Sequence, residues 1–592
     1  MLTPLHTSAI SGLDLYYAFK NGTKQLNLFV DEINQINVFP VRDADTGTNL
    51  YATTKSILDN TIWVRDLKST IKSISSTAIE NAKGNSGSIV ALYLRGIHRS
   101  VDAFDGRSVS SLSEMLGSAY LYVYQKMSAP QEGTILTMMR VWAEQLRVMS
   151  NAEVLSIAEA MRRSVFILRE ALEETKNQLE ILSKVNVVDA GALGFVCFIE
   201  GMLKPYRKGK TKRYTPSKEM LFKTDDVVSS PAFQYCYEVN IVGASKRQEE
   251  INSFLSNYGD SIICTGDEER LHVHIHTDCP TVISKFLSDE GVIEKIKVDD
   301  LQSQYYRSTL KKEKYALVVD STCDLSDEQI SKYHIYKLPM PMEVNGHQHL
   351  DGITITGKEL YEDMQWGDVK CQSSQVSQGF FENFYRSLLD KYDHIISLHI
   401  SKHFSGTYTN ALAAANEVSC ESSSEIDVWD SGTLSAAYGM MVERIAMAAV
   451  HSAKIEDLRS LFQSLKTKID IMVSVRSLDA MVKSGRVPIS MNSLANKLGL
   501  HPMVSMSPEG RAKFGGVVLG FNRSLNRMVR RVAKKKVKRF QVVHVGADFD
   551  AVKLEASLNQ KLRVEHLPYI AVTPVIGVYA GLGSVGVVVE YE

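Results

Sequence analysis

The spacing of apolar residues divides the chain into a helical first third and an α/β remainder. Between about residues 8 and 206, apolar positions recur every three or four residues, as at Ile135, Met138 and Trp142, which is typical of one face of a helix. From about 231 to 300, alternating runs such as YCYEVNIVG and RLHVHIHT flank a helix-like segment and predict a small α/β unit. Further on, apolar strands such as HIISLHI alternate with amphipathic helices such as GFFENFYRSLLDKY, which favours parallel βαβ units.

The same pattern predicts where the domains begin and end. The segment YRKGKTKRYTPSKE is basic and poor in apolar residues, which is typical of a solvated linker. A chain of 592 residues also exceeds the size at which a single core stops growing. We therefore expect an all-helical domain over 1–206, a linker over 207–230, a small α/β domain over 231–308, and an α/β domain over 314–592 with a subdomain break near 470.

One uncharged stretch of twenty residues, from Ile570 to Val589, has the length of a membrane span. Pro574 and four glycines, the first of them Gly577, interrupt it. We therefore expect two buried strands around a turn rather than a membrane helix.

Composition narrows the class of protein. Lys and Arg number 67 and Asp and Glu 68, so the net charge of -1 gives no reason to expect a nucleic-acid partner. The seven cysteines are dispersed without a CxxC pair, which is typical of reduced thiols. The first residues lack a basic region followed by an apolar core, so we expect no signal peptide and a cytoplasmic location.

The loop NVFPVRDADTGTN, residues 37–49, carries two carboxylates two positions apart, Asp43 and Asp45. Mg²⁺ binds one or two carboxylates and leaves its other positions to water and phosphates, so this spacing suits a Mg²⁺ site. The Gly-Asn-Ser-Gly turn at 84–87 allows backbone N–H groups to approach phosphate oxygens. These residues favour a phosphoryl-transfer enzyme; a helix-capping turn is the alternative interpretation.

Four segments in order, NVFPVRDADTGTN, NAKGNSGSI, PQEGTILT and VDAGALGF, resemble the ATP-binding domain of the dihydroxyacetone kinase family, and in particular its fatty acid kinase branch. The resemblance implies an eight-helix barrel that binds ATP through two Mg²⁺ ions. It departs from the usual pattern at Arg42 and Ala44, but both carboxylates are present. The implied metal ligands are Asn37, Asp43 and Asp45, and the implied nucleotide contacts are Thr46, Thr48, Asn49, Asn85, Ser86, Gly87, Thr134, Leu136, Asp189 and Gly191.

The middle domain carries a second set of metal-ligand residues. His274 and His276 lie two apart in a predicted strand, so their imidazoles share one face, and Cys236 lies in another strand. A thiolate and two imidazoles suit Zn²⁺, although half-buried strand histidines with ordinary partners are the simpler interpretation. The segments QYCYEV and HVHIHT resemble the middle domain of fatty acid kinase, which implies a zinc site formed by these three residues.

The last domain resembles the DegV family of lipid-binding proteins through VVDSTCDLS, SSQVS, SKHFSGTYTNA and KSGRVP. The resemblance implies a two-subdomain fold that encloses a fatty acid in a buried tunnel. Hydroxyl groups would bind the carboxylate head, and short hydroxyl donors suit a carboxylate. The implied substrate-binding residues are Ser373, Ser405, Gly406, Thr407 and Tyr579. Ordinary turn chemistry and helix capping are the alternative roles for these residues.

Two residues bear on the transfer step. Arg486 is a candidate catalytic residue that would stabilise charge as the phosphoryl group arrives. Near the C-terminus, the DegV family usually has a histidine where this chain has Tyr579. Tyrosine donates a hydrogen bond but carries no positive charge near neutral pH.

Together these features predict a kinase that uses ATP and Mg²⁺ to phosphorylate a fatty acid held in its own DegV-like domain. A dihydroxyacetone-type kinase and a lipid-binding or regulatory protein with impaired phosphotransfer are the alternatives. The resemblance implies a homodimer. The basic run at 530–539 is typical of a solvated helix face; transient contact with an anionic membrane surface is a second hypothesis.

Overall fold

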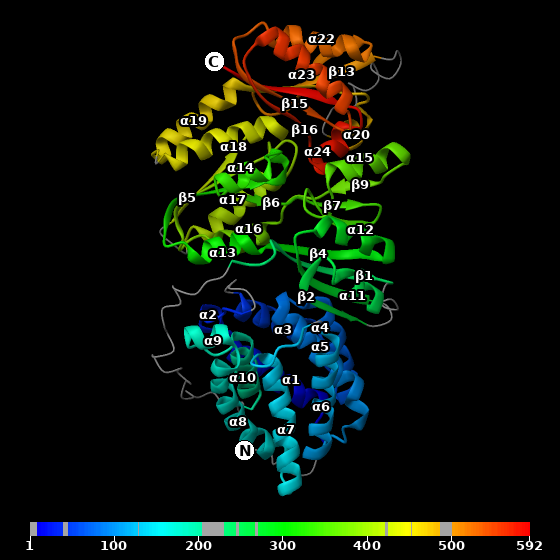
Figure 1. The fold of residues 1–592 in the computed structure, drawn as a ribbon, viewed down its shortest axis with the longest axis vertical. Coiled ribbons are helices and arrows are strands. Elements are labelled where there is room, and N and C mark those ends of the chain that lie inside the picture. The colour runs from blue at the N-terminus through cyan, green and yellow to red at the C-terminus, as the bar shows by residue number, and fades with distance from the viewer. Residues whose placement is uncertain are drawn as a thin grey trace. The chain divides into compact units, whose positions relative to one another are not determined.

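The computed structural model describes residues 9–39, 45–127, 129–203, 230–243, 248–266, 270–420, 424–451, 453–485 and 500–592. Asp43 and Arg486, both predicted site residues, lie outside these ranges. The chain forms two compact units, Met1–Thr309 and Leu310–Glu592 (Figure 1).

The first unit begins with the predicted all-helical region. Its elements are α1 (Gly12–Asn27), α2 (Val30–Gln35), α3 (Thr46–Asn60), α4 (Leu67–Asn81), α5 (Gly84–Ser100), η1 (Val101–Ala103), α6 (Val109–Lys126), α7 (Ile135–Ala152), α8 (Ile157–Gln178), α9 (Glu180–Val185) and α10 (Ala190–Met202). Each of the helices α1, α3 to α8 and α10 packs on the next, and α10 packs back on α1. These eight longer helices thus close a ring around an apolar cavity of about 200 Å³, and the predicted helical fold is confirmed.

Polar residues fix where several of these helices begin. The side chains of Ser108, Thr134, Ser156 and Asp189 each accept a hydrogen bond from a backbone N–H in the first turn of α6, α7, α8 and α10, respectively. Such caps satisfy N–H groups that have no partner inside the helix. Two predicted nucleotide contacts, Thr134 and Asp189, therefore also act as helix caps.

The first unit continues with a small antiparallel sheet of order β2-β3-β1-β4. Its elements are β1 (Tyr235–Val242), α11 (Gln248–Leu255), β2 (Gly259–Gly266), β3 (Arg270–Thr277), α12 (Pro280–Glu290), β4 (Val292–Asp300) and α13 (Leu301–Thr309). Alternate residues of a strand face opposite sides, and here the two sides differ sharply. One side carries apolar residues such as Tyr237, Val273 and Ile275, which pack with α11 and α12.

The other side of this sheet is polar and reactive. Register pairs Cys236 of β1 with His276 of β3 and Asp299 of β4, and it pairs Glu238 with His274 and Lys297 in the same way. Cys236, Glu238, His274 and His276 are nevertheless buried. This side of the sheet, with Asn240, His272 and Lys295 in a third row, is called the polar face below.

The second unit contains the predicted parallel βαβ region, followed by a second sheet. Its elements are β5 (Glu313–Asp320), η4 (Ser321–Cys323), α14 (Asp327–Lys332), β6 (Tyr336–Leu338), β7 (Pro341–Val344), β8 (His347–Leu350), α15 (Gly357–Trp366), β9 (Cys371–Ser373), α16 (Gln378–Arg386), β10 (Tyr392–His399), α17 (Thr407–Val418), β11 (Glu425–Asp430), α18 (Ser435–Val450), α19 (Ile455–Lys468), β12 (Ile469–Ser474), α20 (Asp479–Lys483), β13 (Leu500–Met506), β14 (Ala512–Leu519), α22 (Phe521–Val532), β15 (Val537–His544), α23 (Asp548–Leu562), β16 (Glu565–Ala571), α24 (Pro574–Ala580) and β17 (Val585–Tyr591).

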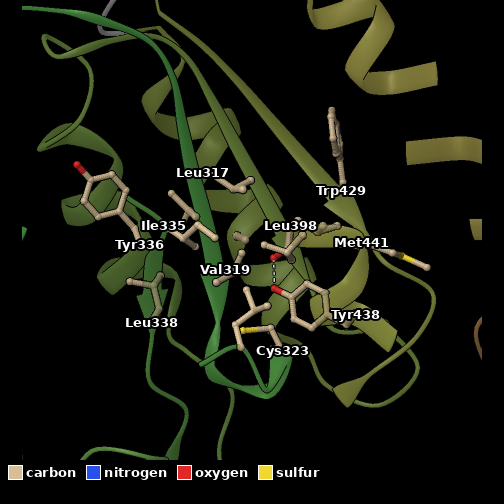
Figure 2. Packing of buried hydrophobic residues seen from close by; sticks show 14 of the residues in the cluster. Leu317, Val319, Cys323, Ile335, Tyr336, Leu338, Leu398, Trp429, Tyr438 and Met441 are labelled. Atoms are coloured by element: carbon tan, nitrogen blue, oxygen red, sulfur yellow. Dashed lines mark hydrogen bonds between the residues drawn. The ribbon is translucent and has the colours of Figure 1, made fainter. Parts of the chain in front are cut away.

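Strands β11-β10-β5-β6 form a parallel sheet, and β14-β13-β12-β17-β15-β16 form a mixed one. The strands β8-β7-β9 make a third, antiparallel sheet. The apolar runs of β5 and β10 are buried, as expected for parallel strands covered on both faces. Figure 2 shows part of this core, in which the Tyr438 hydroxyl donates to the carbonyl of Leu398.

The uncharged stretch at 570–589 differs in one respect from its prediction. It ends in the buried strand β17, as expected, but a short helix, α24, replaces part of the predicted turn. Pro574 begins this helix, a position at which proline loses no helical hydrogen bond. No helix in the described part of the chain is both long enough and apolar enough to cross a membrane.

The basic run at 530–539 ends α22 and enters β15. Arg530, Arg531 and Lys534 are exposed, as a solvated face requires, but Arg539 is buried. Its guanidinium binds the carboxylates of Glu590 at 2.7 Å and Glu443 at 2.6 Å. The prediction of a solvated face is therefore wrong at Arg539, since a buried ion pair needs a partner on another element.

Candidate functional site

The predicted metal loop and the predicted phosphate turn meet in one pocket of the first unit. Asp45 precedes α3, and Gly84, Asn85 and Ser86 form the start of α5. The pocket encloses about 30 Å³, which is room for ions or a few waters. Its walls comprise Asn37, Asp45, Thr46, Asn49, Gly84, Asn85, Ser86, Cys236, His274, His276, Asp299, Leu301 and Gln304.

This pocket also joins two sites that the sequence treats as separate. The implied Mg²⁺ and nucleotide residues come from the helical region, whereas Cys236, His274 and His276 come from the polar face of the small sheet. The implied zinc ligands and Asp45 therefore line the same pocket. It is called the shared pocket below.

Other predicted nucleotide contacts lie outside the walls of the shared pocket. The Thr48 hydroxyl accepts a hydrogen bond from Asn34, and a side chain at Gly87 would collide with Thr53. Leu136 is fully buried in the core. The start of α7 and the start of α10 nevertheless meet, because a Cβ at Gly191 would contact Ile135.

Cys236, His274 and His276 form a compact cluster, called the Cys-His-His cluster below. Their ligand atoms all lie within 4.8 Å of one another, and the Cys236 sulfur is 3.8 Å from Nδ1 of His274. Nε2 of His274 is buried and has no hydrogen-bond partner among the described residues. A soft thiolate beside two imidazoles is a donor set that fits Zn²⁺.

Electrostatics around the cluster depend on two carboxylates and one lysine. Burial, with Glu238 and Asp299 nearby, raises the pKa of the Cys236 thiol, so a bound cation is needed to favour the thiolate. Burial alone would raise the pKa of Glu238, but Lys297 and His274 outweigh it and hold that pKa below its usual range. Glu238 is thus a buried anion, and Lys297, which also pairs with Asp299, helps to balance its charge.

The polar face binds the start of α5 directly. The backbone N–H of Gly84 donates to Oε1 of Glu238 at 2.6 Å, and Ser88 Oγ lies 3.2 Å from Nε2 of His272. Burial lowers the pKa of His272 to about 4, so its ring is neutral near pH 7. Nδ1 of this ring lies 2.8 Å from Oδ1 of Asn240, which fixes Nδ1 as the donor and Nε2 as the acceptor from Ser88.

The second unit contains a cavity of about 300 Å³ lined mainly by apolar side chains. Strands β12, β13, β15 and helix α24 supply Ile471, Val504, Val543 and Ile576. At its polar part lie three of the predicted hydroxyl residues, Ser373, Ser405 and Tyr579, together with Gly406. An apolar cavity with a few polar groups is the usual form of a site for an amphipathic small molecule.

Ser373 and Tyr579 are joined across this cavity wall. Their hydroxyl oxygens are 2.8 Å apart, and the Ser373 N–H donates to the Tyr579 hydroxyl at 3.2 Å. Thr407, by contrast, does not line the cavity: its hydroxyl is buried against Ser405 Oγ at 2.9 Å and the sulfur of Met340 at 3.4 Å. Thr407 therefore supports Ser405 rather than facing the cavity.

Two buried carboxylates hold the helix that carries Tyr579. Asp324 accepts the N–H of Thr573 at 2.8 Å, and Asp351 accepts the N–H of Val575 at 2.9 Å, so both anchor the start of α24. Burial raises the pKa of Asp324 to about 7 and that of Asp351 to about 6. The polar end of the cavity thus rests on carboxyl groups that titrate near neutral pH.

These raised values predict a pH-dependent stability. The pKa of Asp324 is about 7 when folded and about 4 when unfolded. The folded chain therefore binds more protons in between, and the free energy of unfolding falls as pH rises through this range. We expect wild type to lose roughly 3 kcal/mol more stability than Asp324→Asn between pH 5 and pH 8, measured by urea unfolding. Asp363→Asn, at an exposed position of α15, is the control and should match wild type; an unchanged pH dependence in Asp324→Asn would contradict the assignment.

Several wall residues were not predicted from the sequence. In the shared pocket these are Asp299 and Gln304, and in the apolar cavity they include Gln375, Ser435 and His544. Asp299 had a signal: in VIEKIKVDD the polar positions 295, 297 and 299 alternate in the same way as the histidines of β3. Only the strand register shows that these positions share the face of Cys236.

Comparison with known proteins agrees with this division of the chain. The family model for the DAK2 domain matches residues 40–204, and that for the FakA-like middle domain of fatty acid kinase matches 232–308. The model for uncharacterised proteins of the DegV family matches 314–592.

Similar curated proteins include uncharacterized proteins of Staphylococcus aureus. That of strain bovine RF122 / ET3-1 is 28% identical over 313 residues, which is 50% of this chain and 56% of the relative. That of strain MRSA252 is 28% identical over 314 residues, with the same shares. The chain thus spans about half the length of the curated relatives it matches.

Among solved structures, a DegV family protein from Thermus thermophilus, described as fatty acid binding, is 26% identical with a TM-score of 0.43. The match covers 47% of this chain and 100% of that protein. DegV from Bacillus subtilis, described as a fatty acid binding protein, is 21% identical with a TM-score of 0.43, covering 47% and 99%. The family matches confirm the resemblances: the chain joins a DAK2 domain, a FakA-like middle domain and a DegV-family domain in one polypeptide.

Proposed function

We propose that this protein is an ATP- and Mg²⁺-dependent kinase that phosphorylates the carboxylate of a fatty acid bound in its own DegV domain. The observation that carries the proposal is the shared pocket, in which Asp45 and the start of α5 lie together. A carboxylate ligand for Mg²⁺ beside backbone N–H groups suits a polyphosphate. The fatty acid is inferred from the apolar cavity of the second unit and from the DegV-family match, since members of that family are described as fatty acid binding.

The proposed step is a direct transfer. A carboxylate oxygen of the fatty acid attacks the γ-phosphorus of ATP, the bond from that phosphorus to the β–γ bridging oxygen breaks, and ADP leaves with the electron pair. The products are an acyl phosphate and ADP. Mg²⁺ ions held by Asp43, Asp45 and Asn37 would neutralise the phosphate charge, which is most of what such a transfer requires.

The chain's own residues have three tasks in this scheme. Thr46, Asn49, Asn85 and Ser86 would orient the phosphates at the shared pocket. Ser373, Ser405 and Tyr579 would bind and orient the carboxylate through hydroxyl donors. Arg486, which lies outside the described residues, would stabilise negative charge during transfer.

Incubation of the full chain with labelled ATP, Mg²⁺ and a long-chain fatty acid tests this proposal. The acyl phosphate is trapped with hydroxylamine as a hydroxamate. We expect hydroxamate only when fatty acid and Mg²⁺ are both present, and none after EDTA. Phosphorylation of dihydroxyacetone instead would favour the small-molecule kinase, and fatty acid binding without any product would favour the lipid-binding alternative suggested by Tyr579.

We further propose that the Cys-His-His cluster binds one zinc ion. Cys236→Ser should weaken zinc binding at least about 100-fold, because it replaces a thiolate ligand. Metal content after dialysis and competition with a chelating dye measure this. Cys279→Ser, in the same domain but outside the cluster, is the control; equal zinc content in both variants would contradict the site. The homodimer and the membrane-surface contact remain predictions from the sequence.

A further inference from the structure

Glu238 contacts both the Cys-His-His cluster and the phosphate-binding helix. Its Oε1 lies 3.5 Å from Nδ1 of His274 and 3.9 Å from the sulfur of Cys236. The same oxygen accepts the N–H of Gly84, the first residue of α5, at 2.6 Å. One buried carboxylate therefore spans the space between the implied metal ligands and the start of the helix that faces the phosphates.

We propose that Glu238 couples metal binding at the Cys-His-His cluster to nucleotide binding at α5. This inference rests on the proposed nucleotide site and adds a positioning residue to it. A cation at the cluster attracts the carboxylate and restrains the ring of His274, because carboxylates that pair with metal-binding histidines fix their orientation. Glu238 is then held in the position that binds Gly84.

The consequence for the nucleotide is a preorganised helix start. Gly84 has a positive φ of 61°, a conformation that depends on its surroundings to persist. With Glu238 held, the N–H groups of Asn85 and Ser86 are already aimed into the shared pocket, so less freedom is lost on binding. By linkage, nucleotide must then increase the affinity for the metal by the same factor.

The test compares nucleotide affinity in zinc-loaded and chelator-stripped full-length protein, with free zinc removed, by calorimetry with Mg·ADP. For wild type we expect the zinc-loaded form to bind at least about five-fold more tightly. Zinc titration with and without Mg·ADP should give the same factor. In Glu238→Gln, saturated with zinc, the ratio should fall to about one, because the charge that responds to the cation is gone.

Two further variants keep the test sharp. Glu238→Asp keeps the charge but is one methylene shorter, so it should also lose the coupling if one side chain must span both contacts. Glu80→Gln breaks an ion pair with Arg270 that joins the same two regions away from the cluster, and it should keep the coupling. Thermal unfolding of each variant confirms that it is folded.

The outcomes separate this inference from the proposed function. Coupling that persists in Glu238→Gln would show that the metal acts on the phosphates through its charge alone, and it overturns the role of Glu238. Independent binding of zinc and Mg·ADP in wild type overturns the coupling but leaves the kinase proposal intact. No binding of Mg·ADP in either form overturns both.

Discussion

Replacing Asp45 by Asn is expected to lower the rate of acyl-phosphate formation by about 10³-fold. Asp45 lines the shared pocket, and the amide that replaces it is a neutral and much weaker ligand for Mg²⁺. Hydroxamate formation at saturating fatty acid measures the loss. Because the substitution nearly preserves shape, binding of fatty acid in the second unit should be unchanged.

Glu114→Gln is the matched control for this prediction. It neutralises an exposed carboxylate of α6, in the same helical region but outside the pocket. Its rate should equal that of wild type. A second diagnostic is the Mg²⁺ dependence: Asp45→Asn should need a higher Mg²⁺ concentration for half-maximal rate. A rate within three-fold of wild type would contradict the metal-ligand role of Asp45.

The double variant Ser373→Ala with Tyr579→Phe is expected to weaken fatty acid binding by about 100-fold or more. Hydrogen bonds to a charged group each contribute roughly 1.5–3 kcal/mol, and this variant removes both hydroxyls of the bonded pair in the cavity. The apolar wall is retained, so the acyl chain should still enter. The dissociation constant is measured by displacement of a fluorescent fatty acid.

Comparison with the methyl ester of the same fatty acid isolates the role of the carboxylate. Wild type should bind the acid much more tightly than the ester, whereas the double variant should bind the two about equally. The control, Ser387→Ala with Tyr333→Phe, removes a serine and a tyrosine hydroxyl of the same unit outside the cavity. Unchanged discrimination in the double variant would place the carboxylate elsewhere.

The sequence predicted the parts of the first site but not that they form one pocket. Motif order identified the loop that ends at Asp45 and the turn at Gly84, and alternation placed His274 and His276 on one face of a strand. Alternation cannot show what covers that face, because it depends on packing against a distant region of the chain. Contacts such as that of Glu238 with Gly84, which are 154 residues apart, appear only in the folded structure.

The second site shows the same limit. The sequence predicted Ser373, Ser405 and Tyr579 in a fatty acid site, and the structure brings all three to one cavity. It also predicted Thr407, which lies one position too far round the start of α17 and is buried. The residues that anchor α24, Asp324 and Asp351, gave no signal, since each binds backbone more than 220 residues away.

The small antiparallel sheet has a consequence for the order in which this protein matures. Cys236 and His274 belong to different strands, and only the pairing of β1 with β3 brings them together. Shifting that register by one residue would turn the ligands toward the apolar side. The unfolded chain therefore has no preformed zinc site, so metal uptake must follow strand pairing, and zinc content in freshly made protein would report whether this domain has reached its native register.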